Sequence, residues 1–156
     1  MSAIARVLAE RGDDVSGSDR APSEYSRALE GIGVTVHYGH AAENVAGADL
    51  VLVSSAVAPD NPEIAAARAG GIPVLRREAF FQDLTAGNQV IAVAGTHGKS
   101  TTTGMIAWIL DRAGRKPSFI VGGLLTDFGS NARAGAGTPF VIAADEYDRA
   151  LLGLRP

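Results

Sequence analysis

The sequence contains no cysteine, which excludes disulfides and thiolate metal sites and is consistent with a cytoplasmic protein. It also lacks any apolar stretch near the ~20 residues that a helix needs to cross a bilayer. The residues after Met1 lead into a charged amphipathic helix instead of a signal-peptide pattern. We therefore expect a cytoplasmic location and no membrane partner.

Excess positive charge is also lacking. The 156 residues carry a formal net charge of −3, which argues against nucleic acid as the main partner. Hydrophobic residues make up 46% of the chain, enough for a core of ordinary size. Glycine, by contrast, is plentiful and stands mostly at the ends of predicted elements, as expected for an α/β protein with many tight turns.

Helical patterns alternate with short apolar runs along the whole chain. This alternation predicts an α/β fold with a mostly parallel, doubly wound sheet. Residues 127–135 are glycine-rich and predict a loop. The helices are expected at Ser2–Arg11, Pro22–Glu30, from Pro62 after an Asn61 cap, Ala79–Leu84 and Lys99–Arg112, and the strands at 14–19, 34–38, 49–54, 72–75, 89–94, 117–121 and 140–143.

The polar turn at residues 85–88 is the best candidate for a domain boundary, because the strand–helix pattern restarts after it. Residues 1–86 predict a Rossmann-like domain, and residues 87–156 predict the start of a P-loop ATPase-type α/β domain. A nucleotide-binding Rossmann unit would begin with a strand and a glycine-rich turn. This chain begins with a helix, so we expect the first strand of that unit to be missing.

The most informative stretch is Gly95-Thr96-His97-Gly98-Lys99-Ser100-Thr101, which follows an apolar strand and opens a helix. Glycines let backbone N–H groups close around phosphate oxygens, and the helix N-terminus adds its positive dipole end. Lys99 is a cation for the outer phosphates, and the Ser100 hydroxyl is a Mg²⁺ ligand type. The pattern departs from the strict Walker sequence, since Val93 stands where the first glycine would be. We predict an ATP site with Mg²⁺.

Two pairs of polar residues follow other predicted strands. Ser18 and Asp19 end one strand, and Ser54 and Ser55 end a buried one. Ligands bind at the carboxyl ends of strands in open α/β sheets, so these four residues are candidates for ligand contacts. A serine pair in a turn more often bonds only to the backbone. Asp19 fits a turn or helix cap equally well. His37 and His40 fit structural roles better than ligand contacts, and a local backbone bond suits His97 nearly as well as a nucleotide contact.

An acidic cluster, Asp145, Glu146 and Asp148, follows the last predicted strand. Carboxylates at that edge can hold Mg²⁺ or orient a nucleophile. A solvated acidic loop is the alternative, and the shared edge with the glycine loop favours the functional interpretation.

Together these motifs resemble the Mur ligases. The segment from Ala94 to Thr103 is similar to their ATP loop, and the similarity continues through residues 53–64, 73–78 and 144–149. Within the family, the serine pair and Asp60-Asn61-Pro62-Glu63 favour the branch that adds L-alanine to UDP-N-acetylmuramate. A recycling ligase that attaches a tripeptide to the same UDP-sugar is the alternative within the family.

The resemblance implies an ATP-dependent amide-forming ligase of peptidoglycan synthesis that works through an acyl phosphate. By position, Lys99 would be catalytic, residues 95–101 would bind ATP and Ser100 would ligate Mg²⁺. Ser18, Asp19, Ser54 and Ser55 would lie near UDP-N-acetylmuramate, while L-alanine would need domains beyond this chain.

One departure from the family pattern concerns the metal. The family has a Mg²⁺-binding glutamate where this chain has Ala143, and a methyl group cannot ligate a cation. We therefore expect the 156-residue chain alone to form no acyl phosphate. A non-catalytic nucleotide-binding module is the alternative from a different functional class.

Overall fold

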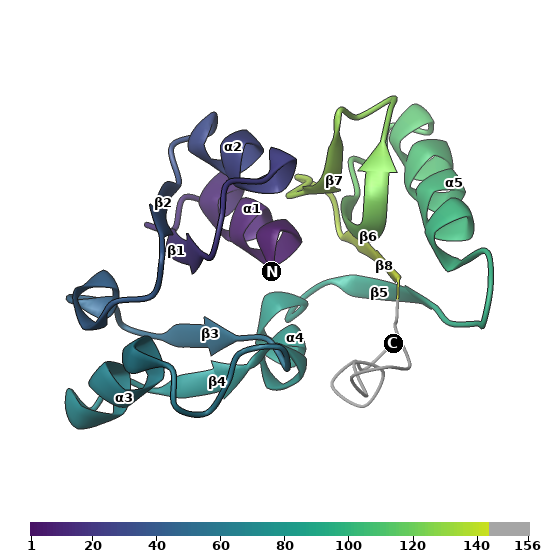
Figure 1. Ribbon diagram of the computed structural model, residues 1–156. Helices are drawn as coiled ribbons and strands as arrows, with labels where there is room; N and C mark the ends of the chain where they lie inside the picture. The colour runs from purple at the N-terminus through teal and green to yellow at the C-terminus, as the bar shows by residue number, and fades with distance from the viewer. Residues whose placement is uncertain (144–156) are drawn as a thin grey trace.

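The computed structural model describes residues 1–143, and the acidic cluster at 145–148 lies outside the described residues. Helices and strands alternate as predicted (Figure 1). None of the helices in this range is long and apolar enough to cross a membrane. In chain order the elements are α1 (Ser2–Arg11), β1 (Ser16–Asp19), α2 (Glu24–Glu30), β2 (Thr35–Tyr38), the 3-10 helix η1 (Ala42–Val45), β3 (Val51–Val53), α3 (Pro62–Ala69), β4 (Val74–Arg76), α4 (Arg77–Leu84), β5 (Gln89–Val93), α5 (Lys99–Arg112), β6 (Ser118–Leu125), β7 (Ser130–Arg133) and β8 (Pro139–Ala143).

The strands of the first half form two separate parallel pairs, β1 with β2 and β3 with β4. The expected parallel pairing is confirmed. The expected single sheet is not found, because no ladder joins β1 to β3 within the described range. Each pair leaves edge strands whose backbone groups lack a neighbouring strand.

The second half contains a four-stranded sheet in the order β5-β8-β6-β7. β5, β8 and β6 run parallel, and β7 is antiparallel to β6. The predicted loop at 127–135 is therefore wrong in part, since β7 occupies Ser130–Arg133. Its polar Ser-Asn-Ala-Arg sequence has no strand signature, and the pairing with β6 across the turn at Gly129 decides its conformation.

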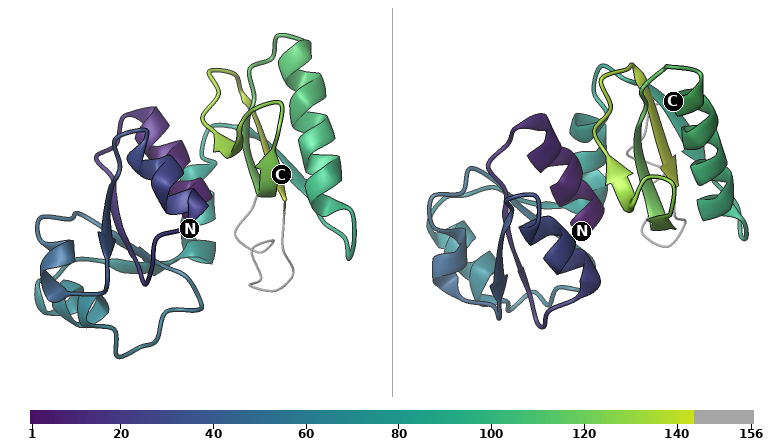
Figure 2. Two further views of the ribbon diagram at one scale, coloured as in Figure 1. Left: turned by 45° about the horizontal axis from the view of Figure 1, so that its top comes forward. Right: turned by 90° about the horizontal axis from the view of Figure 1, so that it is seen from above.

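Side chains alternate across the two faces of this sheet, as strand geometry requires. Phe119, Val121 and Val141 pack with Ala107 of α5 on one face. Ile120, Phe140 and Ile142 face the other way. Figure 2 shows α5 on one side of the sheet and the first half of the chain on the other.

The core on that second face crosses the predicted boundary at residues 85–88. Buried residues of α1, α4 and the sheet form one cluster, which consists of Ile4, Val7, Phe81, Leu84, Ile120, Ala132, Phe140 and Ile142. Two polar contacts reinforce it. The Arg11 guanidinium donates to the Leu84 carbonyl at 2.8 Å, and the Ala134 N–H donates to Glu10 at 2.7 Å. The two halves therefore share a hydrophobic core.

The apolar residues Met105, Ile106, Ile109 and Leu110 fall on one side of α5 and predict that this side is buried, but the structure buries a different face. Ile106 and Leu110 are partly buried, but Met105 and Ile109 are 59% and 55% exposed. Small residues make the closest contact, because a Cβ at Gly104 would come within 2.7 Å of Leu125 Cδ2. The exposed side of α5 carries Met105, Trp108 and Ile109 beside a shallow hollow against Phe128.

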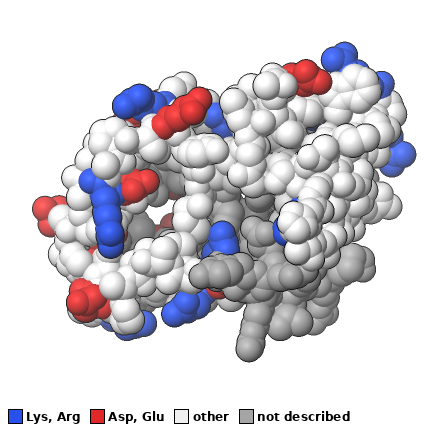
Figure 3. Space-filling view, turned by 45° about the vertical axis from the view of Figure 1, so that its right-hand side comes forward, with Lys and Arg blue, Asp and Glu red and all other residues white. Residues whose placement is uncertain are grey.

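Charged residues of both signs are interspersed over the face drawn in Figure 3. They form no extended single-sign patch among the described residues on that face. This distribution gives no support to a nucleic-acid surface there.

Candidate functional site

The glycine loop leaves β5 and enters α5, which is the arrangement that phosphate binding requires. Gly95 has φ +144° and Gly98 has φ +76°, conformations that favour glycine. Gly98 is the N-cap of α5, and no side chain caps the first turn of that helix. The first-turn N–H groups and the dipole end therefore suit an anion, and the residues present fit a nucleotide phosphate.

Lys99 lies within this loop. Its Nζ donates to the Gly95 carbonyl at 2.6 Å, so the ammonium group is held across the mouth of the loop. The buried Thr103 hydroxyl donates to the Lys99 carbonyl at 2.8 Å, which anchors the backbone of the first turn. The ammonium group can accordingly meet outer phosphate oxygens while the backbone stays fixed.

The other predicted loop residues are open to solvent. Thr96, His97 and Gly98 are exposed, as are Ser100 and Thr101. The structure thus leaves both interpretations of His97 possible, a nucleotide contact or a local bond. Gly95 and Lys99, by contrast, are partly buried.

The Ser100 hydroxyl faces a glycine of a neighbouring strand. A Cβ placed at Gly122 of β6 would lie 3.3 Å from Ser100 Oγ. Ala143 ends β8, the strand between β5 and β6, and pairs with Val93. The hydroxyl of Ser100 therefore lies at the same end of the sheet as Ala143, and Ala143 contributes no oxygen ligand there.

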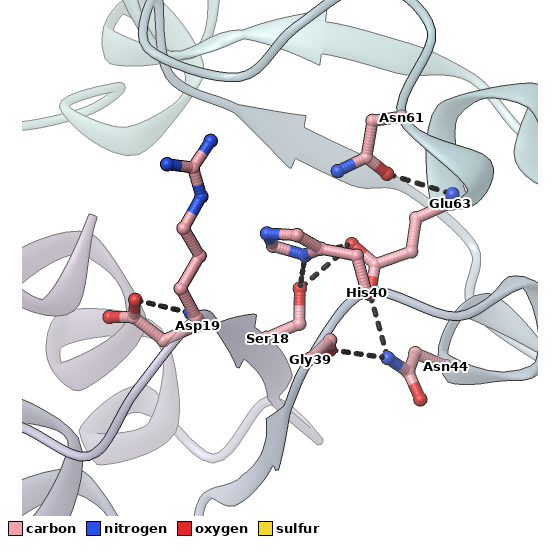
Figure 4. A network of polar contacts seen from close by, with 8 residues as sticks. Ser18, Asp19, Gly39, His40, Asn44, Asn61 and Glu63 are labelled. Carbon is pink, nitrogen blue, oxygen red and sulfur yellow. Dashed lines mark hydrogen bonds and ion pairs between the residues drawn. The ribbon is translucent and has the colours of Figure 1, made fainter.

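Ser18 is the centre of a polar network at the end of β1 (Figure 4). Its hydroxyl donates to Glu63 Oε2 at 2.7 Å and lies 3.0 Å from His40 Nδ1. His40 Nδ1 is also 3.3 Å from Glu63 Oε2, and Asn44 Nδ2 donates to Glu63 Oε1 at 2.7 Å. A residue at the end of β1 thus meets residues that follow β2 and β3 at one edge, and ligands bind at such edges in open α/β sheets.

Local sequence explains how Glu63 reaches this edge. Asn61 caps α3, its side chain accepting the Glu63 N–H at 2.8 Å, and Pro62 starts the helix. Burial raises the pKa of Glu63. Hydrogen bonds from Asn44 and Ser18 and the nearby His40 outweigh that effect, so the pKa of Glu63 falls below its ordinary value of 4.5.

Asp19, beside Ser18, is exposed and uses one carboxylate oxygen to accept the Arg20 N–H at 2.7 Å. This is the turn role that the sequence left open, and it leaves the other oxygen available. Burial and the charge of Arg77 lower the pKa of the Met1 amino group, while Asp19 opposes them. The start of α1 therefore lies near the same edge.

Ser54 and Ser55 follow β3, as predicted. Ser54 is partly buried and its carbonyl accepts the Val57 N–H at 3.2 Å, whereas Ser55 is exposed. Since Glu63, beyond this turn, contacts Ser18, the turn after β3 and the end of β1 face one edge of the first half. The candidate residues of the nucleotide-sugar site are consistent with a common location.

Sequence reasoning missed His40, Asn44 and Glu63 as members of the site. Each looks ordinary alone: a histidine after a strand, an asparagine in a short helix and a glutamate in a first helical turn. A possible signal was that all three follow predicted strand ends. Their convergence needed the parallel pairing of β1 with β2 and the packing of η1 against α3.

The family described as "Mur ligase family, catalytic domain" matches residues 1–89. The chain belongs to the Mur ligase family. This match ends before the glycine loop, so the loop is supported by its own geometry and by the whole-chain relatives.

Curated relatives of this Mur ligase chain match along its full length. It is 50% identical over 156 residues to the UDP-N-acetylmuramate–L-alanine ligase of Laribacter hongkongensis, and 51% identical to that of Dechloromonas aromatica. The match covers 100% of this chain but 33% and 34% of those relatives. The chain therefore spans about a third of the length of the curated ligases that it matches.

Solved structures support the fold. A murein peptide ligase from Psychrobacter arcticus is similar over 100% of this chain and 39% of its own, with a TM-score of 0.90 and 32% identity. The UDP-N-acetylmuramate–alanine ligase of Thermotoga maritima is similar over 94% of this chain and 34% of its own, with a TM-score of 0.86 and 35% identity. The expected family and its α/β fold are thus confirmed.

Proposed function

We propose that this chain supplies the UDP-sugar site and the ATP loop of a UDP-N-acetylmuramate–L-alanine ligase, a cytoplasmic enzyme of peptidoglycan synthesis. The observation that carries the proposal is 49–51% identity along all 156 residues to ligases of that name. The uncapped first turn of α5 and the Lys99 position in the glycine loop support the ATP part.

The proposal divides the chain at the boundary expected from the sequence. Residues 1–86 would hold UDP-N-acetylmuramate through Ser18, Asp19, Ser54 and Ser55, and residues 87–156 would begin the ATP-binding domain. The core shared across this boundary would keep the two sites in a constant relation. L-alanine would be bound by parts of the ligase beyond this chain.

When bound with Mg²⁺, ATP supplies the phosphoryl group that activates the muramate carboxylate. The first-turn N–H groups of α5 would bind its phosphates, and Lys99 would neutralise charge on the outer oxygens during transfer. Ser100 would hold the metal from the side of Gly122. Residues 95–98 would fix the backbone around the phosphates.

Two alternative functions each have one observation in their favour. The recycling tripeptide ligase is favoured by the 32% identity and TM-score of 0.86 with UDP-N-acetylmuramate:L-alanyl-gamma-D-glutamyl-meso-diaminopimelate ligase from Neisseria meningitides. The higher identities to alanine ligases favour the first proposal. A non-catalytic nucleotide-binding module is favoured by Ala143.

Isothermal titration calorimetry tests the proposal by measuring how tightly the chain binds Mg-ATP and UDP-N-acetylmuramate. Lys99→Ala should weaken Mg-ATP binding by about tenfold or more, because a charge-assisted phosphate contact contributes about 1.5–3 kcal/mol. It should leave UDP-N-acetylmuramate binding unchanged. Lys116→Asn is the matched control, since it removes a lysine outside the loop at a position with φ +44° that asparagine tolerates. Equal Mg-ATP affinity in Lys99→Ala and the wild type would refute the ATP part.

A further inference from the structure

The network around Ser18 constrains where its protons lie. Ser18 has one hydroxyl proton, and two neighbours lie within reach of it: Glu63 Oε2 at 2.7 Å and His40 Nδ1 at 3.0 Å. An ionised carboxylate can only accept. The short Ser18–Glu63 contact therefore uses the Ser18 proton.

With that proton committed to Glu63, the Ser18–His40 contact needs a proton from the imidazole. His40 Nδ1–H must be the donor, to Ser18 Oγ and, at 3.3 Å, toward Glu63 Oε2. The opposite assignment would place two unprotonated oxygens 2.7 Å apart. The network thus requires a proton on His40 Nδ1, and in a singly protonated ring Nε2 is then the unprotonated nitrogen.

The other contacts of the network hold the Glu63 carboxylate in place as the acceptor of the Ser18 hydroxyl. Asn44 Nδ2 donates to Glu63 Oε1 at 2.7 Å and to the Gly39 carbonyl at 3.2 Å, so the amide also ties the carboxylate to the turn after β2. The Asn61 cap fixes the backbone of Glu63. Both carboxylate oxygens are therefore engaged from defined directions.

In the Nδ1–H tautomer, Nε2 carries an unshared electron pair. Figure 4 shows this second ring nitrogen directed away from Ser18 and Glu63. The His40 side chain is 26% exposed, so a ligand can reach it. An electron pair attracts a hydrogen-bond donor and repels a phosphate oxygen, which is itself an acceptor.

We propose that His40 Nε2 accepts a hydrogen bond from the nucleoside part of the bound UDP-sugar, either from the uracil N3–H or from a ribose hydroxyl. Ser18, Glu63 and Asn44 act as positioning residues that hold the tautomer. This inference rests on the proposed UDP-sugar site and specifies the chemistry of that site. It also assigns Ser18 an indirect role, in which its hydroxyl acts through His40.

Binding of UDP, 2′-deoxy-UDP, 3′-deoxy-UDP and N3-methyl-UDP to the 156-residue chain tests the proposal by calorimetry. An analogue that lacks the hydrogen-bond donor recognised by His40 should bind about tenfold more weakly than UDP, as expected for the loss of one hydrogen bond of about 1.4 kcal/mol. A loss with N3-methyl-UDP identifies the base, and a loss with either deoxy compound identifies the ribose. Equal affinity for all four ligands overturns the proposal.

Two variants separate the two nitrogens of His40. His40→Asn keeps a donor near the Nδ1 position but removes the Nε2 acceptor, so it should weaken UDP binding about tenfold and abolish the discrimination between analogues. His40→Gln restores an acceptor oxygen near the Nε2 position and should recover most of the affinity. Unchanged UDP affinity in His40→Asn overturns the proposal.

Nitrogen-15 NMR of the imidazole adds a readout that does not depend on affinity. The free protein near neutral pH should show a protonated Nδ1 and an unprotonated Nε2 at His40, and UDP should shift the Nε2 resonance. A protonated Nε2 overturns the proposal, whether or not Nδ1 also carries a proton. Absence of UDP binding with intact Lys99-dependent ATP binding also overturns it but leaves the ATP proposal standing, whereas absence of both refutes the proposed function itself.

Discussion

Glu63 accepts the hydroxyl proton of Ser18 at 2.7 Å, although 45 positions separate the two residues in the sequence. The contact joins the end of β1 to the first turn of α3. It brings the end of β1 and the start of α3 to one edge of the first half. Several properties of the chain can be tested from this and related contacts.

Glu63→Gln should lower the free energy of unfolding by roughly 1 kcal/mol at pH 7, because charge-assisted hydrogen bonds become neutral ones. The lowered pKa of Glu63 sets the pH dependence. Its stabilising effect is present above the ordinary value of 4.5 and is lost as the pH falls through the lower folded-state pKa. The difference between variant and wild type should therefore shrink on acidification below about pH 4.5.

Urea unfolding at pH 7 and at about pH 3 measures this effect. Glu43→Gln is the control, since Glu43 is an exposed residue of η1. A Glu63→Gln deficit that is equally large at both pH values would contradict the prediction.

Ile4→Ala should destabilise both halves of the chain together. Ile4 is 3% exposed and packs in the cluster that includes Phe140 and Ile142 of the second half. The expected loss is about 2–5 kcal/mol. Trp108 on α5 is the only tryptophan, so its fluorescence reports on the second half alone. In Ile4→Ala, the unfolding midpoint followed by Trp108 fluorescence should fall by the same amount as the midpoint followed by far-ultraviolet circular dichroism.

Leu124→Ala is the matched control for Ile4→Ala. Leu124 is 52% exposed, so its truncation should change stability by less than about 0.5 kcal/mol. A Trp108 transition that keeps its wild-type midpoint in Ile4→Ala would show that the halves unfold independently.

Gly137→Ala should destabilise the second half. A Cβ at Gly137 would clash with the Arg115 carbonyl, and the backbone there cannot move easily because the Gly137 N–H donates to the Lys116 carbonyl at 2.8 Å. Overpacking of this kind costs about 1–3 kcal/mol. Gly123→Ala is the control, since a Cβ at Gly123 would meet nothing within 4 Å. Thermal midpoints of the two variants compare them directly, and equal midpoints would argue against the close approach.

Ala143→Glu should strengthen the Mg²⁺ dependence of nucleotide binding. It places a carboxylate at the end of β8, next to the strand that leads into the glycine loop. One added oxygen ligand should increase Mg-ATP affinity about tenfold, or about 1.4 kcal/mol. Titration with ATP, with and without Mg²⁺, measures the effect. Ala143→Gln, which lacks the charge, should show a much smaller gain, and equal gains in the two variants would rule out metal ligation.

The local signals of the sequence predicted most elements and the glycine loop. Asn61-Pro62 marked the start of α3 correctly, because capping is a short-range interaction. Gly95 and Gly98 marked a loop whose backbone needs glycine at both positions. The apolar runs of β5 and β8 identified the parallel strands that carry it.

The signals failed where distant segments decide the outcome. β7 has the composition of a loop and becomes a strand through its pairing with β6. The apolar pattern of α5 pointed to Met105 and Ile109, but Gly104 allows the closest approach to Leu125 and rotates another face inward. No local pattern indicated that α1 would complete the core of the second half.

By itself, the sequence determined most of the helices and strands, the glycine loop before α5 and the membership in the Mur ligase family, since these depend on residues close together in the chain. Only the tertiary structure decided that Ser18, His40, Asn44 and Glu63 meet. Those contacts join segments that follow different strands. Their geometry is set by the pairing of β1 with β2 and the packing of η1 against α3, not by spacing along the chain.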